Sequence, residues 1–253
     1  MWMTLRIECR KLWRQPLERW LAFGLVFLAP LVLVLGGVPE GLTRSGGRPL
    51  RQGLQTAAHL WPILGFVIGP VVGAHNIGAE LSLGTLPLMV SRTGSRSGVL
   101  AAKALAQSLY FILLVTLTTA AACTAAAMTG SEGRGLHGDE FGIWLATGML
   151  FAILVTMVLF GVVALVMTYI ARSAAAGVGI ALTLQLVGSN TFGEALAPYL
   201  PWYYIQQAST VVTWDHARVV WRAEGLAGAA AVIGYAAAIL AGGNALMSRR
   251  DVG

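Results

Sequence analysis

The side chains in this sequence that could take part in chemistry are mostly charged groups gathered between long apolar stretches. The most informative of these groups begins at Glu80, contains Arg92 and Arg96, and ends at Lys103. Polar and apolar residues intermingle here, which is compatible with a short helix parallel to a membrane, whose charged ends could bind another protein. The alternative is an ordinary connecting loop whose arginines fix the orientation of its flanking helices.

The sequence carries none of the common enzyme motifs. It has no GxxxxGK[ST] phosphate loop, because neither of its two lysines, Lys11 and Lys103, follows a glycine. HExxH and G-x-S-x-G are also missing, and Cys9 and Cys123 are too far apart in the sequence to suggest a metal site or a disulfide framework. We therefore expect no catalytic residue, metal or cofactor in this chain.

The composition excludes an ordinary soluble protein. Of 253 residues, 57% are hydrophobic and 11% are charged, whereas soluble domains carry about 25% charged residues. Such a chain needs lipid around its outer surface, which predicts an integral membrane protein in contact with membrane lipids. The basic residues behind the net charge of +6 cluster at the ends of apolar stretches, where they set topology, so we expect no nucleic acid partner.

Six charge-free stretches are long enough to cross a hydrocarbon core of about 30 Å, which takes about 20 residues of helix. Because the backbone must satisfy its own hydrogen bonds in lipid, each is predicted to be helical, and the fold class is all-α with six transmembrane helices in one domain over residues 1–253. The predicted spans are Trp20–Pro39, Gln52–Ala79, Ala104–Ser131, Phe141–Ala171, Ser173–Gly193 and Gly225–Ser248.

A further uncharged segment, Ala195–Trp214, contains Pro198 and Pro201. Because prolines are costly inside an isolated span, we interpret residues 190–224 as an extracytoplasmic region with a re-entrant or interfacial segment. A seventh span is the alternative. With six spans, most of the 17 lysines and arginines fall on the side that holds both termini, which predicts cytoplasmic termini.

Residues 1–16 have the pattern of an amphipathic helix. The apolar residues Trp2, Leu5, Cys9 and Leu12 recur at spacings of three and four and form one stripe. The opposite face carries Glu8, Arg10, Lys11, Arg14, Gln15 and Glu18. Such a helix lies in the membrane interface with its basic face toward anionic headgroups. It is either a simple anchor or an elbow helix that also docks a cytoplasmic partner.

The sequence resembles the ABC-2 type permeases, whose signature ExxxGTL…SR…K is matched by Glu80, Gly84, Thr85, Leu86, Ser91, Arg92 and Lys103. The layout is similar as well, since the family has an N-terminal elbow helix, six spans and short helices that dip back between spans five and six. Residues 87–89 and 93–94 depart from the residues usual in that family.

The resemblance implies the permease subunit of an ATP-driven exporter in the cell membrane. Residues 80–98 would form a cytoplasmic coupling loop docked on a separate ABC ATPase, which binds the ATP and Mg that this chain does not. A second permease copy or a similar chain would complete the transporter. The implied coupling residues are Glu80, Gly84, Thr85, Arg92 and Arg96, with Gly84 allowing close backbone approach.

Small and polar residues inside the spans suggest packing or a transport path. Gly65, Gly69 and Gly73 form overlapping GxxxG patterns, which indicate either tight packing within one subunit or, with the nearby prolines, a bend that moves during gating. The polar residues serve interhelical hydrogen bonds or line a translocation path, for which the candidates are Tyr110, Gln185 and Asn190.

The absence of charges in the middle of the spans argues against an ion-coupled carrier. It suits an apolar or amphipathic substrate, such as a drug, an antimicrobial peptide or a lipid-like molecule. A non-transporting membrane scaffold or assembly factor fits the spans equally well, but leaves the signature unexplained. An intramembrane enzyme is a third alternative, for which no catalytic set is found.

Overall fold

The computed structural model describes residues 2–36, 49–93, 95–128, 139–190, 201–215 and 218–250. Nearly all of this is helical, which confirms the all-α part of the predicted fold class, and one short β-hairpin is an addition to it. The elements are α1 (Trp2–Arg14), α2 (Pro16–Gly36), α4 (Pro49–Ser82), α5 (Leu86–Thr93), α6 (Arg96–Met128), α7 (Asp139–Ala171), α8 (Ala174–Asn190), α9 (Pro201–Ser209), β1 (Val212–Asp215), β2 (Arg218–Trp221) and α10 (Ala223–Arg250).

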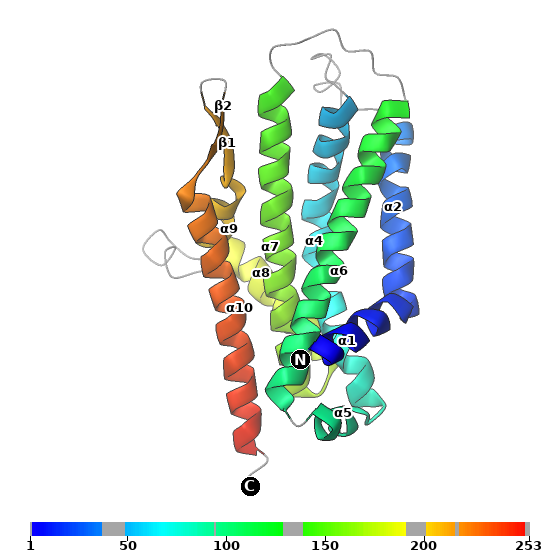
Figure 1. Cartoon of the computed structure of the whole chain (residues 1–253), viewed down its shortest axis with the longest axis vertical. Helices are drawn as coiled ribbons and strands as arrows, with labels where there is room; N and C mark the ends of the chain where they lie inside the picture. The colour runs from blue at the N-terminus through cyan, green and yellow to red at the C-terminus, as the bar shows by residue number, and fades with distance from the viewer. Residues whose placement is uncertain are drawn as a thin grey trace.

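The long helices α2, α4, α6, α7 and α10 run alongside one another as a bundle (Figure 1). Within the described residues, four helices are long and apolar enough to cross a membrane. The apolar segments of α4 and α7 are 56% and 67% buried, whereas the apolar segments of α6 and α10 are 33% and 28% buried. Helices α4 and α7 therefore form the centre of the bundle. The four segments are Leu64–Ser82, Ser97–Met128, Ala146–Ala171 and Ala223–Leu246. The chain is a multi-pass membrane protein.

The glycines of α4 form its contact with α7. A Cβ added at Gly73 would lie 2.1 Å from the carbonyl oxygen of Gly161, and one at Gly69 would lie 3.0 Å from that of Met157. The two backbones therefore approach as closely as small residues allow, which supports the packing interpretation of the GxxxG pattern.

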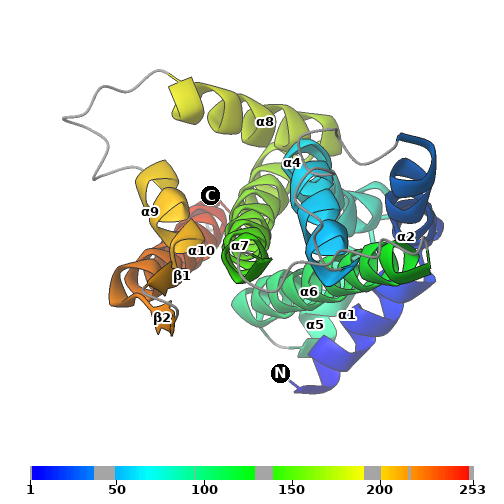
Figure 2. The same ribbon diagram turned by 90° about the horizontal axis from the view of Figure 1, so that it is seen from above.

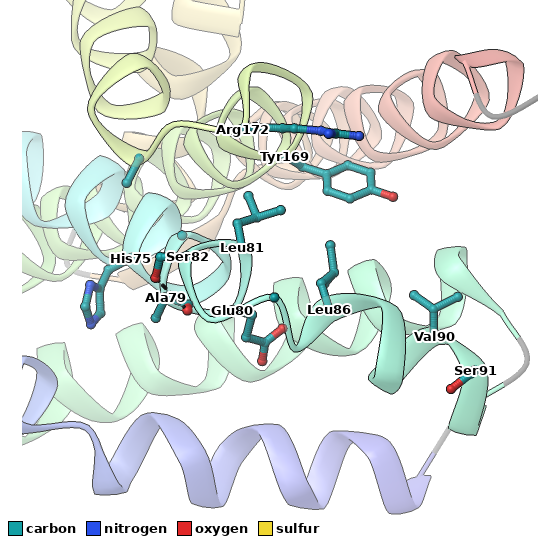
Figure 3. Close-up of a pocket in the computed structure, with 13 residues that line it drawn as sticks. His75, Ala79, Glu80, Leu81, Ser82, Leu86, Val90, Ser91, Tyr169 and Arg172 are labelled. Atoms are coloured by element: carbon teal, nitrogen blue, oxygen red, sulfur yellow. Dashed lines mark hydrogen bonds between the residues drawn. The ribbon is translucent and has the colours of Figure 1, made fainter. Parts of the chain in front are cut away.

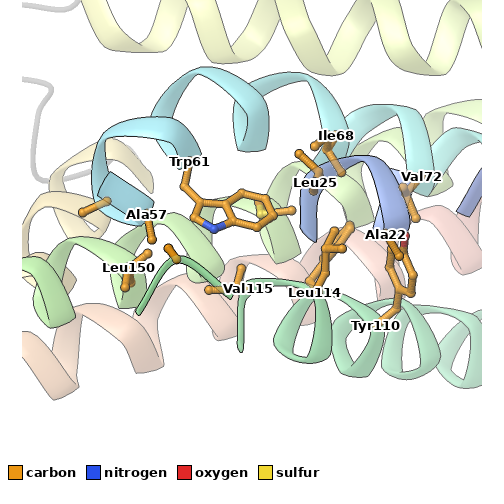
Figure 4. Close-up of a cluster of buried hydrophobic side chains, with 14 of the residues drawn as sticks. Ala22, Leu25, Ala57, Trp61, Ile68, Val72, Tyr110, Leu114, Val115 and Leu150 are labelled. Carbon is orange, nitrogen blue, oxygen red and sulfur yellow. The ribbon is translucent and has the colours of Figure 1, made fainter. Parts of the chain in front are cut away.

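An apolar cluster fills the space between α2, α4, α6 and α7. Its largest side chain, Trp61, is fully buried beside Val115 and Leu150, with Leu25 contributed by α2 (Figure 4). These residues come from four segments far apart in the sequence, and the cluster fixes the bundle around α4.

The ends of the bundle differ. The N-terminus, α5 and the C-terminus lie at one end, and the β-hairpin lies at the other (Figure 1). In the hairpin, Val212 pairs with Trp221 and Asp215 with Arg218. Helix α9 has only nine residues, about 14 Å of helix at 1.5 Å per residue, and it is followed by a strand. The alternative of a seventh span over residues 195–214 is therefore wrong.

Two of the predicted spans were not among the four long apolar segments. Helix α2 covers most of the first predicted span, and part of that span lies outside the described residues. Helix α8, at the fifth predicted span, has 17 residues and extends away from the end of α7 at a wide angle to the bundle (Figure 2).

Candidate coupling site

The turn that follows α4 is built around Gly84, whose φ of +64° lies in the left-handed region that favours glycine. The N–H of Thr85 donates to the carbonyl of Glu80 at 3.0 Å, and the N–H of Gly84 donates to that of Leu81 at 3.2 Å. This pair of bonds is a Schellman motif, which ends a helix at a defined residue. Helix α5 therefore begins at Leu86 with little freedom relative to α4.

Within this chain, Gly84 is needed for its backbone conformation. A Cβ added at this position would meet nothing within 4 Å, so no close contact inside the chain requires a glycine here. Close approach to an ATPase through Gly84 stays a prediction. Thr85 adds a weak contact to the same turn, because its hydroxyl donates to the Glu80 carbonyl at 3.5 Å.

Helix α5 has one buried side and one exposed side. Leu86 is buried in a cluster with Leu100 and Ala104 of α6. Leu88 is 60% exposed, and Leu83 in the preceding turn is 75% exposed. The start of the following helix, α6, is stabilised by an N-cap, because Ser95 Oγ accepts the N–H of Gly98 at 3.2 Å. The short helix thus presents apolar side chains outward from a well-fixed frame.

A buried lysine joins three helices beneath α5. The Lys103 ammonium, on α6, is fully buried and donates to Glu8 Oε2 at 2.9 Å, to Glu80 Oε1 at 2.8 Å and to the Asn76 carbonyl at 3.0 Å. Glu8 belongs to α1, and both Glu80 and Asn76 belong to α4. The three ammonium hydrogens therefore tie α6 to α1 and to the end of α4.

Lys11 lies on the solvent side of this group and contacts both glutamates. Its side chain is 40% exposed, and its ammonium donates to Glu80 Oε1 and lies 3.7 Å from Glu8 Oε1. Two lysines thus face two glutamates, and the formal charges cancel. Removing one partner of a buried ion pair costs about 3–5 kcal/mol, because the remaining charge is left uncompensated. We call Glu8, Lys11, Glu80 and Lys103 the ionic joint.

The ionic joint corrects two sequence predictions. Glu8 was placed on the exposed face of the N-terminal helix but is fully buried. Glu80 was expected to contact the ATPase, yet only 8% of its side chain is exposed and it faces the two lysines. A signal for Glu8 was present, because Leu5, Glu8 and Leu12 are spaced as i, i+3 and i+7 and share one side of the helix.

A second buried carboxyl stabilises the bend between α1 and α2. Glu18 is fully buried and its backbone carbonyl accepts the Tyr110 hydroxyl at 2.8 Å. Its Oε1 lies 3.9 Å from His75 Nε2, and the Gln15 amide, turned to satisfy both groups, donates to it at 2.8 Å. Glu18 precedes the first predicted span, and burial raises the pKa of its carboxyl, with His75 opposing that shift.

The other predicted site residues lie in different places. Arg92 is in the last turn of α5 and Arg96 opens α6, while their side chains lie outside the described part of the structure. The hydroxyl of Tyr110 is already bonded to α2. Gln185 is buried on α8, and its Oε1 has no hydrogen-bond partner among the described residues. Asn190 is the last residue of α8, and its side chain is also outside the described part.

A cavity of about 910 Å³ opens beside the ionic joint. Its walls come from the end of α4, from α5, from the end of α7 and from the start of α8. Figure 3 shows the Glu80 side chain directed toward α6, whereas Leu81 and Leu86 face Tyr169 and Arg172. Glu80 therefore belongs both to the ionic joint and to the wall of the cavity.

The turn between α7 and α8 carries an unusual backbone conformation. Arg172 has a φ of +53°, in the left-handed region, which costs a residue other than glycine roughly 1–2 kcal/mol. Ser173 then starts α8, since its Oγ accepts the N–H of Ala176 at 3.4 Å. In the sequence, Arg172 was only one of the basic residues that predict the orientation of the chain in the membrane.

Comparison with known proteins gives one finding. A family model described as "ABC-2 family transporter protein" matches residues 4–188, well over half of the chain. This range runs from α1 to near the end of α8 and includes the whole ionic joint. No curated protein matches the chain, and no solved structure matches it.

Proposed function

We propose, from the premise that this chain belongs to the ABC-2 transporter family, that it is the permease subunit of an ATP-driven exporter. Members of this family are membrane transport components that do not themselves catalyse a reaction, and they work with an ABC ATPase. In this proposal two cytoplasmic ATPase subunits bind ATP and Mg, and a second permease copy or a similar chain completes the membrane part.

The observation that carries the proposal is the position of α5. It projects at one end of the bundle between the ends of α4 and α6, with Leu83 and Leu88 exposed. An exposed apolar pair on a short, well-fixed helix and the turn before it is suited to binding another protein. Arg92 and Arg96 flank the link to α6 and are our candidates for polar contacts with the ATPase.

Movement of α5 would pass to the membrane helices through rigid links. The Schellman turn couples α5 to α4, and the glycine contact couples α4 to α7. The ionic joint adds α1 and α6 to the same unit. Closure of the ATPases would then displace a connected body of helices, as alternating access requires. In this mechanism Glu80 acts by holding the joint together, while Gly84 and Thr85 shape the turn.

The proposal includes a topology and a substrate class. Helices α2, α4, α6, α7, α8 and α10 would cross the plasma or inner membrane, with both termini and α5 in the cytoplasm and the hairpin outside. The substrate would be apolar or amphipathic, and Gln185 and Asn190 are the proposed path residues, with Tyr110 the weakest candidate because its hydroxyl is already bonded to α2.

Co-purification tests the proposal. The tagged chain, extracted in mild detergent, should retain an ABC ATPase in a fixed ratio, and Leu88→Ser should reduce that retention at least fivefold. Leu226→Ser removes a 51% exposed leucine near the opposite end of the bundle and should leave retention unchanged. If no ATPase is retained by the unmodified chain, a non-transporting scaffold becomes the better explanation. Equal retention by Leu88→Ser would show that α5 is not the docking helix.

A further inference from the structure

The cavity beside α5 combines apolar walls with polar groups at one side. Leu81, Leu86 and Val90 line it from α4 and α5, and Tyr169 and Arg172 line it from the end of α7. Figure 3 shows the Tyr169 ring and the Arg172 side chain extending in the same direction, opposite the leucines. A volume of about 910 Å³ is in the range of cavities that hold drug-sized ligands.

Among the described residues, the positive charge on this side of the cavity has no acidic partner. Arg172 is exposed, and no ion pair or hydrogen bond to its guanidinium is formed by the described residues. Glu80, the acidic residue that lines the cavity, is directed toward α6 and is bonded to Lys11 and Lys103. In the described part of the chain, the cavity therefore presents an unpaired cation next to apolar side chains.

The backbone gives a second, independent reason to assign a role to this arginine. The α7–α8 turn places residue 172 in the left-handed region, where a glycine would be unstrained. Strained residues persist where the surrounding structure holds them in place, and they cluster at ligand-binding and other functional sites. A role of Arg172 in fixing the membrane orientation of the chain does not explain the strain, because an arginine at an unstrained neighbouring position would fix the orientation equally well.

We infer that this cavity binds an anionic amphiphile, with its carboxylate or phosphate headgroup on Arg172 and its alkyl chain against Leu81, Leu86 and Val90. A guanidinium can donate two parallel hydrogen bonds to such a headgroup. The Tyr169 hydroxyl, on the same wall, supplies a further donor. As an account of cargo, this inference rests on the proposed function, because it narrows the amphipathic substrate class to anions taken up from the cytoplasmic side.

Binding of radiolabelled dodecyl phosphate to the full chain in phosphatidylcholine nanodiscs tests the inference, after subtraction of uptake by empty nanodiscs. Unlabelled dodecyl phosphate should compete, whereas dodecyltrimethylammonium and dodecanol, which share its chain, should not. Equal competition by all three would show that the cavity selects only the chain, and would overturn the inference.

Two variants separate the side chain from the fold. Arg172→Gly should bind dodecyl phosphate at least tenfold more weakly, equivalent to about 1.4 kcal/mol, while its melting temperature stays equal to or above that of the unmodified chain. Arg172→Lys should keep the preference for anions with reduced affinity. Arg6→Ala removes an exposed arginine of α1 and should leave binding unchanged. Unchanged binding by Arg172→Gly would overturn the inference, and a simultaneous loss of ATPase retention would identify Arg172 as a protein contact.

A bilayer phospholipid is the other source of the same headgroup chemistry. Equal binding in nanodiscs of phosphatidylcholine with and without phosphatidylglycerol supports a mobile amphiphile, and loss of binding with phosphatidylglycerol would show that a membrane lipid fills the cavity. The assay contains no ATPase, so its result concerns the cavity alone, and the co-purification experiment concerns the proposed function alone.

Discussion

Helix α4 is held in two physically different ways along its length. In its middle, Gly69 and Gly73 pack directly on the backbone of α7 without any charged group. At its end, Glu80 is held by two lysines from α1 and α6. Backbone packing depends on shape and tolerates no added atom, whereas an ionic joint depends on charge and can be rebuilt with neutral groups. The middle of α4 should therefore tolerate no added side chain, whereas its end should tolerate substitutions that keep the charges balanced.

The largest effect should come from the glycine contact. Gly73→Val would place atoms against the Gly161 carbonyl, and because both groups are on regular helices neither can move aside. We expect loss of the monodisperse protein in size-exclusion chromatography. Gly24→Ala adds a Cβ where nothing lies within 4 Å and should purify normally. A well-folded Gly73→Val protein would show that α4 and α7 are not in close contact.

Breaking the ionic joint should have the next largest effect. Lys103→Met leaves the carboxylates of Glu8 and Glu80 buried with only Lys11 to compensate them, at a cost of about 3–5 kcal/mol. We expect a clear fall in melting temperature and in cargo-stimulated ATP hydrolysis. Adding Glu8→Gln and Glu80→Gln to Lys103→Met should recover much of the stability, since no unpaired charge is left. Failure of the triple variant to recover would argue that shape, not charge, matters at this end.

A smaller effect is expected at the turn. Gly84→Ala must adopt a positive φ, which costs about 1–2 kcal/mol, although no neighbour obstructs the new methyl group. Coupled ATP hydrolysis should fall as α5 loses its fixed direction. Gly84→Asn is the matched control, because asparagine tolerates the left-handed region, and it should retain more coupling than Gly84→Ala. The opposite order would contradict the conformational role of Gly84.

The smallest effect concerns pH. Burial raises the pKa of Glu18 above its ordinary value, so the folded chain binds this proton more tightly than the unfolded chain. Its contribution to stability is therefore fully present below about pH 4.3, the unfolded value, and is lost as pH rises through the folded value. The difference in melting temperature between Glu18→Gln and the unmodified chain should grow in favour of the variant as pH increases. A constant difference would show that Glu18 does not titrate in this range.

The sequence predicted those features that depend on local pattern. Long apolar stretches identified the helices, and the mixture of polar and apolar residues after Glu80 left a short helix before Lys103 as one of two alternatives, the other being an ordinary loop. The ionic joint was not predictable in the same way, because Glu8 and Lys103 are far apart in the chain and only tertiary packing brings them together. The direction of α8 and the cavity at Arg172 also depend on how helices are placed, which the period of a single helix does not specify.

The buried lysine also places a constraint on biogenesis. Glu8 leaves the ribosome early, and its fully buried counterion, Lys103, is synthesised only after α2, α4 and α5. Until then, the N-terminal segment cannot form the Glu8–Lys103 ion pair that holds it against α6. In nascent chains that end before α6, this segment should therefore stay accessible to proteases. Protease sensitivity of the N-terminal segment would then distinguish incomplete chains from complete ones, because only the complete chains contain Lys103.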